Sequence, residues 1–546
     1  MRARPTTTAL LMALAFSVGC GGEDETPDAG PPDAASEAPS DPGDAGVDAG
    51  HDAGPPRPPA RIFARRYVSK IRDRPDREAF RIGYLRAGAI MQATTGEPVR
   101  TDDPRCRGGW YELTTGGFVC NGRDVIAFWG RRLPAVQGAQ PDRSAPLPYR
   151  YGRTRGNDIP MYRRPPTDEE AAQYEGFRIP GLTPEPGEEG AEGGSSEAGD
   201  AASEAVTPTA TAGSAPGVTA ASASAASGSP EGGGDDDPAE EAEEEPITLA
   251  SLAGDRNSVL ITRMVSGWIV SLDRDFRAGQ YRRRYWRTVN NGFIPYRAVG
   301  DVSWPDFRGV PLGDLTQLPV GYVMGSNEAF FVRTADGRAR RGGAAESRTR
   351  LTIVGEETIG GTPYYVGANG RLYREQDVRR IGPARRPRQV GEHDKWIEVN
   401  LSEQYVVAYE GDTPVYVTLT STGRAYHPDD PDSNFLTPTG TYRIRAKHLA
   451  ATMDGDTAAD GPYSIHDVPY VMYFQLAYAL HGAFWHRAFG YPRSHGCVNL
   501  APRDAQWIFN WSDPYVPQGW HGAYPTEDHP GTWVWIHGET PGSGSR

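Results

Sequence analysis

The chain has 546 residues, of which 66 are Gly and 48 are Pro, a length and composition that exclude one compact body with a single core. Residues 21–59 contain ten acidic residues and one basic residue, and residues 184–246 contain sixteen acidic residues and none basic, within a formal net charge of −14. The formal net charge of the remaining residues is therefore +11. A basic remainder favours an anionic partner, although evenly solvated arginines would give the same sum.

The first twenty residues have the composition of an export signal. Arg2 and Arg4 precede an apolar run at residues 9–16, which is too short to span a bilayer, and small residues lead to Cys20. The stretch "SVGC" resembles a bacterial lipobox, and this resemblance implies cleavage before Cys20 and lipidation of its thiol. A plain secretory signal is the alternative. No later segment is apolar enough to cross a membrane.

A lipid anchor at Cys20 would place the protein in the cell envelope, facing the periplasm. Gly21 follows the cysteine, so the Asp that retains enterobacterial lipoproteins in the inner membrane is absent and the outer membrane is favoured. In this location we expect the wall polymer to be the anionic partner, and we expect no nucleic acid.

Two segments, residues 21–59 and 184–246, consist mainly of Ala, Gly, Pro, Ser and acidic residues. They cannot bury enough apolar surface to offset the entropy of ordering, so we expect a disordered tether and a disordered interdomain linker. Residues 60–183 and 247–390 contain short apolar runs separated by Gly-containing turns. They predict a small β module with an extension in the first segment and one or two modules in the second.

One pattern recurs in these β segments. In "YELTTGGFV" (111–119) and "WRTVNNGFI" (286–294), an aromatic residue is followed by five residues and then by Gly-Phe and a branched residue. The segment "YYVGANGRLY" (364–373) shows a weaker form of this pattern. Strand pairs joined by a Gly turn predict small β-barrel modules. The segments resemble bacterial Src-homology-3-like domains, which implies binding of wall peptides. A purely structural spacer role is the alternative.

Residues 391–540 have the pattern of a mainly antiparallel β domain. Two alternating runs meet at a hairpin signature, residues 410–412, and residues 467–486 form a long β-leaning run. Pro502 predicts the first turn of a helix downstream of Cys497. The apolar face of this helix is expected to contain Ala505, Ile508, Phe509 and Trp511.

Four cysteines give a second line of inference. If Cys20 carries lipid, Cys106 and Cys120 can form a disulfide between adjacent strands of a hairpin in an oxidising compartment. Cys497 is then unpaired. It could be an inert buried thiol, a zinc ligand with nearby histidines, or a nucleophile.

The neighbours of Cys497 favour the nucleophile. Gly496 and the polar Asn499 are unlike the surroundings of an inert thiol, and the histidine spacings match no paired Cys/His zinc motif. We therefore expect no metal and no cofactor. A loop can return His481 to Cys497 as a base. The start of the following helix would add a positive dipole end, and backbone amides at His495, Gly496 and Cys497 would form an oxyanion hole.

The stretch "ALHGAFWHRAFGYPRSHGCVNL" (479–500) closely resembles the active-site signature of the L,D-transpeptidase (YkuD-type) catalytic family. "STG" (421–423) and "TPTGTYRI" (437–444) match other landmarks of that family, and the resemblance covers roughly residues 396–537. It implies a β-sandwich catalytic domain with a helix after the active-site cysteine, preceded by small β-barrel modules and disordered linkers.

The resemblance also implies an activity. Cys497 would attack the diaminopimelate carbonyl of a peptidoglycan stem tetrapeptide, release D-Ala and form a thioester that an amine acceptor resolves, which crosslinks or remodels the wall. His481 would be the base, and the carbonyl of Gly482 would hold its tautomer. An L,D-carboxypeptidase, with water as acceptor, and a non-catalytic peptidoglycan-binding lipoprotein are the alternatives.

The remaining site residues follow from the same resemblance. Ser494, His495, Gly496 and Asn499 would shape the pocket, and Asn499 stands where many family members have Arg, which removes an anchor for a substrate carboxylate. Tyr473, Tyr478 and Trp485 are expected to line the stem-peptide groove, although strand alternation assigns at least half of the nearby aromatic residues to the core. His486 is expected to be a surface or packing residue.

Overall fold

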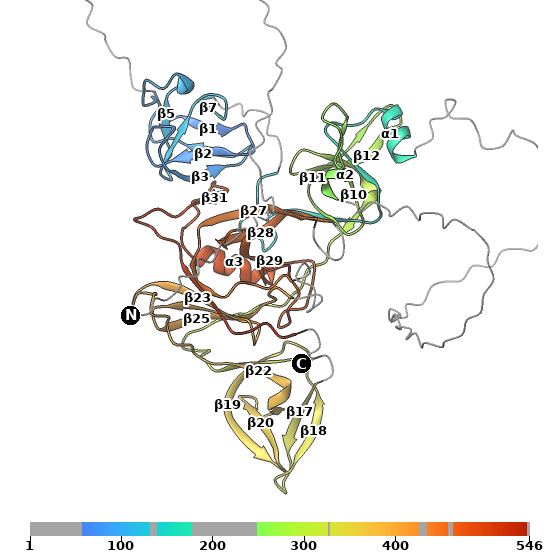
Figure 1. The fold of residues 1–546 in the computed structure, drawn as a ribbon, viewed down its shortest axis with the longest axis vertical. Coiled ribbons are helices and arrows are strands. Elements are labelled where there is room, and N and C mark those ends of the chain that lie inside the picture. The colour runs from blue at the N-terminus through green and yellow to red at the C-terminus, as the bar shows by residue number, and fades with distance from the viewer. Residues whose placement is uncertain are drawn as a thin grey trace, which may run out of the picture. The chain divides into compact units, whose positions relative to one another are not determined.

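The computed structural model describes residues 57–130, 139–176, 248–325, 328–424, 434–456 and 462–542 (Figure 1). The predicted signal peptide with Cys20, most of the predicted tether and the whole predicted linker 184–246 lie outside these residues. The chain divides into two compact units, Met1–Glu175 with Ile247–Arg546 and Gly176–Pro246, and all described helices and strands belong to the first. Among the described residues, no helix has the length and apolar character needed to cross a membrane.

Seven short strands form the first β module: β1 (Arg61–Ala64), β2 (Ser69–Arg72), β3 (Arg81–Leu85), β4 (Ile90–Gln92), β5 (Trp110–Glu112), β6 (Phe118–Cys120) and β7 (Val125–Phe128). One sheet has the order β4-β1-β7, and the other strands follow the order β3-β2-β6-β5. Alternate side chains face a common core, in which Ile62, Ile71 and Val119 are fully buried.

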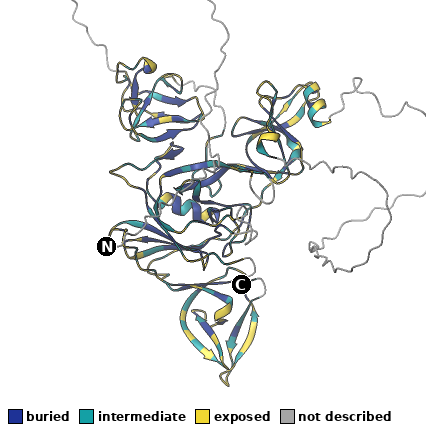
Figure 2. Cartoon of the chain, viewed as in Figure 1, coloured by how far each residue is buried: buried dark blue, intermediate teal, exposed yellow. Residues whose placement is uncertain are grey.

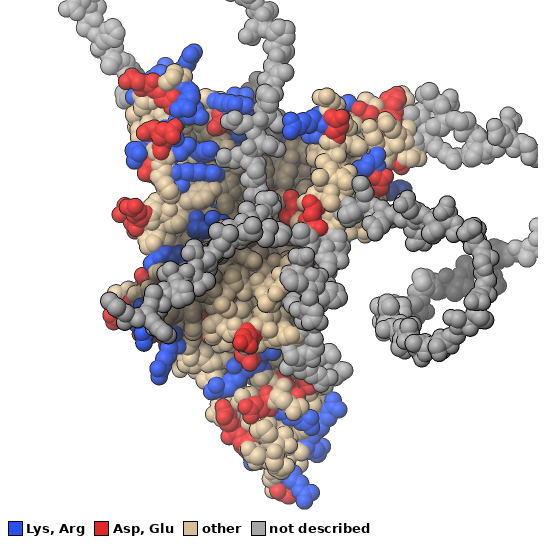
Figure 3. Space-filling view, in the orientation of Figure 1, with Lys and Arg blue, Asp and Glu red and all other residues tan. Residues whose placement is uncertain are grey.

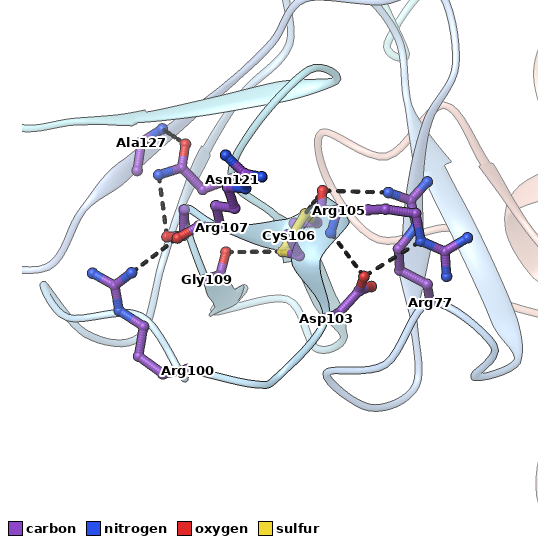
Figure 4. Close-up of a disulfide and its surroundings, with 11 residues drawn as sticks. Arg77, Arg100, Asp103, Arg105, Cys106, Arg107, Gly109, Asn121 and Ala127 are labelled. Carbon is purple, nitrogen blue, oxygen red and sulfur yellow. Dashed lines mark hydrogen bonds and ion pairs between the residues drawn. A yellow bond between two sulfur atoms is a disulfide. The ribbon is translucent and has the colours of Figure 1, made fainter.

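Cys106 and Cys120 form a disulfide with a Cα–Cα distance of 5.7 Å (Figure 4). Cys120 ends β6, whereas Cys106 lies in a 3-10 turn, Pro104–Cys106, and not in a strand as the sequence suggested. The turn is fixed because the Asp103 carboxylate accepts a hydrogen bond from the backbone N–H of Arg105 at 2.9 Å. The disulfide therefore fastens a loop to a strand.

A second β module is assembled from two separate stretches of the chain, residues 150–175 and 248–301, and is called the split module below. Its elements are β8 (Arg150–Thr154), β9 (Ile159–Tyr162), α1 (Asp168–Glu175), α2 (Leu249–Leu252), β10 (Leu260–Met264), β11 (Ile269–Ala278), β12 (Arg283–Thr288), β13 (Phe293–Pro295) and β14 (Val299–Asp301). β8 pairs with β11 and β14, and β9 pairs with β10 and β13. The structure thus places β8 and β9 with the later stretch, whereas the sequence grouped residues 60–183 together.

The third module is a seven-stranded antiparallel sheet with the order β18-β17-β21-β20-β19-β16-β22. Its strands are β16 (Val320–Val323), β17 (Ala329–Arg333), β18 (Ala339–Ala344), β19 (Arg350–Ile359), β20 (Thr362–Gly367), β21 (Leu372–Arg374) and β22 (Val378–Ile381). The recurring motif forms the hairpins β5-β6, β12-β13 and β20-β21, one in each module. The predicted pairs of strands joined by a Gly turn are confirmed.

The described part of residues 394–540 contains two sheets and one helix. The elements are β23 (Lys395–Asn400), β24 (Tyr405–Glu410), β25 (Thr413–Leu419), β26 (Gly440–Arg443), β27 (Ala446–Gly455), β28 (Tyr463–Gln475), β29 (Tyr478–Gly482), β30 (Val498–Leu500), α3 (Pro502–Trp511), β31 (Gly522–Ala523) and β32 (Trp533–His537). One sheet has the order β25-β24-β23-β32-β26, extended at β25 by β15 (Val310–Pro311), and the other contains β31-β27-β28-β29-β30.

The core of this domain lies between its two sheets and α3, as the buried segments in Figure 2 show. Ile397 and Val534 of one sheet and Met472 and Leu480 of the other are fully buried in one cluster with Ile508 of α3. The mainly β fold with a helix after Cys497 is therefore confirmed. The predicted hairpin at residues 410–412 is confirmed as well, because Glu410 pairs with Thr413.

Both ends of α3 are held by buried charged groups. At its start, Asp504 accepts hydrogen bonds from the Tyr416 hydroxyl at 2.8 Å, the Gly309 N–H at 2.8 Å and the Thr418 hydroxyl. Burial raises the pKa of Asp504 to about 6, although these hydrogen bonds act in the opposite direction. At the other end, the ammonium of Lys447 donates to the backbone carbonyl of Ser512 at 2.6 Å. These contacts fix the helix behind β28 and β29.

Positive and negative side chains are interspersed on the face of the molecule shown in Figure 3. On this face, the excess of basic residues does not gather into one patch of a single sign.

Candidate active site

Cys497 and His481 come together through the register of two parallel strands. β29 pairs with β30 so that His481 lies opposite Asn499. Cys497 lies directly before β30, two residues from Asn499. All three line a cavity of about 300 Å³. The residues predicted to be nucleophile and base therefore share one cavity.

Cys497 is half-buried and is not part of a disulfide, and its Sγ lies 3.8 Å from the carbonyl oxygen of Ala477. The preceding turn requires glycine, because Gly496 has a φ of 112° and a Cβ there would meet the Tyr478 ring at 2.5 Å. The Ser494 hydroxyl donates to the carbonyl of Cys497 and closes this turn.

The two upstream landmarks hold the same turn from the other side. The Thr437 hydroxyl donates to the carbonyl of Gly496 at 2.7 Å and accepts from the N–H of Gly423 at 2.9 Å. The "STG" and "TPTG" stretches therefore act together as a support for the backbone before Cys497.

The backbone N–H of Gly496 donates to Ser494 Oγ at 3.1 Å and so takes part in this turn. The predicted oxyanion hole of backbone amides and the predicted contribution of the α3 dipole stay predictions.

His481 is buried, with 2% of its surface exposed. Burial lowers its pKa to about 4, because the imidazolium would lose its hydration. The ring is therefore neutral at pH 7. Nδ1 lies 3.4 Å from the carbonyl oxygen of Gly482, and a proton on Nδ1 leaves Nε2 as the basic nitrogen. Trp485 stacks on the ring with a centroid distance of 5.8 Å.

His486 is part of the cavity lining and not a surface residue. Its Nδ1 accepts a hydrogen bond from the N–H of Ala488 at 3.2 Å, and its Nε2 lies 3.0 Å from the carboxamide of Asn499. Burial, reinforced by the charge of Arg493, lowers the pKa of His486 to about 3. Asn499 is therefore held as a neutral, buried group by a neutral histidine.

The aromatic residues separate into lining and packing positions. Trp485 lines the cavity, whereas Tyr473 and Tyr478 are not among the described lining residues. Tyr473 packs against His448, and Tyr478 packs against Gly496 and the core. His495 also lines the cavity, where its ring stacks on Tyr463 at a centroid distance of 5.2 Å.

Several lining residues were not found by sequence reasoning. The split module supplies residues 266–269 and Arg153, and the catalytic domain supplies Arg424 and Arg493. No local signal distinguishes these arginines from the other basic residues of the chain. The pairing of β11 with β28, between segments far apart in the sequence, brings the split module to the cavity.

No group of three or more His, Cys, Asp or Glu side chains within the described ranges is arranged to hold a metal ion.

Residues 394–540 match the family model of the L,D-transpeptidase catalytic domain, YkuD. This segment is a YkuD-type domain. No curated protein matches the chain. Among solved structures, an L,D-transpeptidase mutant from Enterococcus faecium is 23% identical, with 26% of this chain and 50% of that chain aligned and a TM-score of 0.20.

Two further solved structures are similar to the YkuD-type domain. The catalytic domain of an E. faecium L,D-transpeptidase is 25% identical, with 27% of this chain and 98% of that chain aligned and a TM-score of 0.20. An L,D-transpeptidase from Stackebrandtia nassauensis is 21% identical, with 28% and 60% aligned and a TM-score of 0.20. The chain thus spans about half the length of the E. faecium L,D-transpeptidase mutant.

Proposed function

We propose that the protein is a peptidoglycan L,D-transpeptidase in which Cys497 is the nucleophile and His481 the base. The observation that carries this proposal is the thiol of Cys497 in the same cavity as a buried neutral histidine, within the segment that matches the catalytic-domain family. A thiol beside an imidazole is the arrangement that cysteine acyl transfer requires.

The proposed reaction has two acyl transfers. Nε2 of His481 accepts the thiol proton while Sγ of Cys497 bonds to the diaminopimelate carbonyl carbon of the donor stem. The peptide C–N bond to D-Ala then breaks, and the imidazolium returns the proton to the leaving amine. An acceptor amine attacks the thioester, loses a proton to His481 and forms the new amide, and the thiol is restored.

His481 is neutral at pH 7, which is the state that the first step requires. A base must be neutral to accept a proton, and burial keeps this ring neutral well below pH 6.5. Trp485 restricts its rotation by stacking, and the Gly482 carbonyl offers an acceptor for the other nitrogen. The neutral Asn499, fixed by His486, would contact uncharged parts of the stem peptide.

The same proposal includes location. An anchor through lipid on Cys20, most simply in the outer membrane, would place the cavity in the periplasm where the wall polymer lies. The modules before the catalytic domain would then bind or approach the wall.

Incubation with purified sacculi, followed by mass analysis of the released muropeptides, tests the proposal. The wild-type protein is expected to produce diaminopimelate-to-diaminopimelate crosslinks, and Cys497→Ala none. Stems shortened by D-Ala without crosslinks would assign an L,D-carboxypeptidase instead. Crosslinks made equally by Cys497→Ala would overturn the assignment, and binding without any change in muropeptides would indicate a non-catalytic lipoprotein.

A further inference from the structure

We infer that the split module forms a wall of the catalytic cavity and that Arg153 on this wall binds a carboxylate of the donor stem peptide. The choice of donor rests on the proposed function. The placement of Arg153 beside Cys497 rests on the cavity alone, because both residues line it.

The strand register brings Arg153 to this wall. Arg153 of β8 lies opposite Ile269 of β11, and Ile269 lies opposite Ile465 of β28. Residues opposite one another on neighbouring strands share a face of the sheet, and two strand spacings correspond to about 10 Å. Ile269 and Ile465 line the same cavity. Arg153, whose side chain is exposed, therefore extends over one continuous surface with them.

The wall is fastened to the catalytic domain at three points. The indole N–H of Trp268 donates to the carbonyl of Pro462 at 3.0 Å. The hydroxyl of Tyr151 donates to the carbonyl of Asp467 at 2.6 Å, and the hydroxyl of Ser271 donates to the carboxylate of Asp467. Asp467 and Ser271 are completely buried. These contacts hold β8 and β11 in place, so the position of Arg153 is fixed by buried hydrogen bonds.

Asp467 is fixed in turn by Arg86 of the first β module. The guanidinium lies 2.6 Å from the carboxylate, and 3% of the Arg86 side chain is exposed. Burial alone would raise the pKa of Asp467, but the charge of Arg86, the hydrogen bonds from Arg86 and Ser271 and the charge of His466 together lower this pKa. Asp467 therefore stays ionised, and the anchor of the wall is maintained across the neutral pH range.

The charged side chains among the described lining residues of the cavity are all basic. Arg153, Arg424 and Arg493 line it, and the described lining residues include no Asp or Glu. The charge of Arg493 acts inside the cavity, since it contributes to the lowered pKa of His486. An arginine can bind a carboxylate through two parallel N–H···O bonds. A stem peptide carries several carboxylates, so the wall and the donor are complementary.

Arg153 brings a positive charge to the cavity, whereas Asn499 brings none. Asn499 is 3% exposed and contacts His486, so it offers no cation to the cavity. Two arginines of the lining, Arg424 and Arg493, belong to the catalytic domain, and Arg153 adds a cation from a different module of the same chain. We therefore expect donor specificity to depend on the split module as well as on the YkuD-type domain.

The alkylation of Cys497 provides a test of the wall that does not require transpeptidase activity. The rates of alkylation by iodoacetate, which is an anion, and by iodoacetamide, which is neutral, are measured at one pH. A change in the thiol pKa changes both rates by the same factor and therefore cancels in their ratio. One unit charge about 7 Å away in water-like surroundings changes this ratio by about threefold. Arg153→Gln is expected to lower the ratio at least this much, and Arg153→Lys to restore part of it.

Arg274→Gln is the matched control. Arg274 is an exposed arginine on β11 of the same module and does not line the cavity. It is expected to leave the ratio at the wild-type value. Arg153 is exposed, so its substitution should leave the melting temperature unchanged, which can be checked by circular dichroism. If the ratio of the two alkylation rates is unchanged in Arg153→Gln, the inference is overturned, regardless of the activity of the enzyme on sacculi.

Kinetics with defined donors then test the substrate. Arg153→Gln is expected to raise KM about tenfold for a tetrapeptide donor with free carboxylates while kcat stays near the wild-type value. The effect should disappear when the recognised carboxylate is converted to a carboxamide. An effect equal for all donors would contradict carboxylate binding. A protein with the altered alkylation ratio but no action on any donor would overturn the proposed function and leave the charged wall established.

Discussion

Two cavities in the described part of the catalytic domain differ in size, charge and content. The larger, of about 570 Å³, contains both signs of charge, and its cations face acids: Lys395 lies 3.3 Å from Asp513, and Arg443 lies 3.8 Å from Asp394. Its described lining contains no cysteine. The described lining of the smaller, of about 300 Å³, contains the thiol of Cys497, three histidines and three arginines. The combination of reactive groups, and not the volume of the cavity, therefore distinguishes the candidate active site.

The largest expected difference between the cavities is at their histidines. His481→Gln removes the base and is expected to lower kcat about 10²- to 10⁴-fold. His529→Gln is the matched control, because His529 is an exposed residue that lines the larger cavity. It should leave kcat unchanged. Steady-state crosslinking assays measure both, and equal losses in the two variants would contradict the assignment of the smaller cavity.

The ion pairs behind the two cavities should differ in their contribution to stability. Asp467→Asn leaves the buried Arg86 without its counter-charge and is expected to cost about 3–5 kcal/mol in the free energy of unfolding. Asp513→Asn breaks the exposed pair with Lys395 and is expected to cost about 0–1 kcal/mol. Denaturant titration of both variants measures the difference. If Asp467→Asn were the milder change, the buried pair would not be an anchor of the wall.

Stability should also fall as the pH is lowered. Burial lowers the pKa values of four histidines, to about 4 for His448 and His481 and to about 3 for His486 and His521. Below pH 6.5 the unfolded chain binds more protons at these residues, so their contribution is complete above pH 6.5 and is lost toward pH 3–4. Asp504, with its pKa raised to about 6, acts in the opposite direction between about pH 6 and 4.

Four histidines outweigh one carboxyl group, so the melting temperature is expected to fall by about 5 °C or more between pH 7 and pH 5. His481→Gln should make this dependence shallower. A melting temperature that rises over this interval would contradict neutral burial of the histidines.

The elements that could be predicted from the sequence are specified by residues that lie close together in the chain. The hairpin at residues 410–412 needs only a Gly turn between two alternating runs, and α3 needs Pro502 and an apolar face. The motif at Cys497 is local as well. These features lie within a few residues of their determinants, which is why the central pair of the site could be named.

The missed features depend on contacts between distant residues. β8 precedes the segment 176–246 and pairs with β11 after it, and local alternation cannot specify such a partner. For the same reason Arg153 was not identified. Strand alternation placed Tyr473 on one of two faces without saying which face meets the cavity. The role of His486 depends on its contact with Asn499, which only the folded chain shows.

The central claim is that the Cys497 thiol carries the acyl group during the reaction, and intact-protein mass spectrometry after mixing with a tetrapeptide donor tests it most directly. The wild-type protein is predicted to gain the mass of the donor without its terminal D-Ala, and hydroxylamine should release this adduct as it does other thioesters. Cys497→Ala should gain no mass. An adduct of the same mass on Cys497→Ala, or crosslinks formed by the wild-type protein without any adduct under rapid quenching, would contradict the claim.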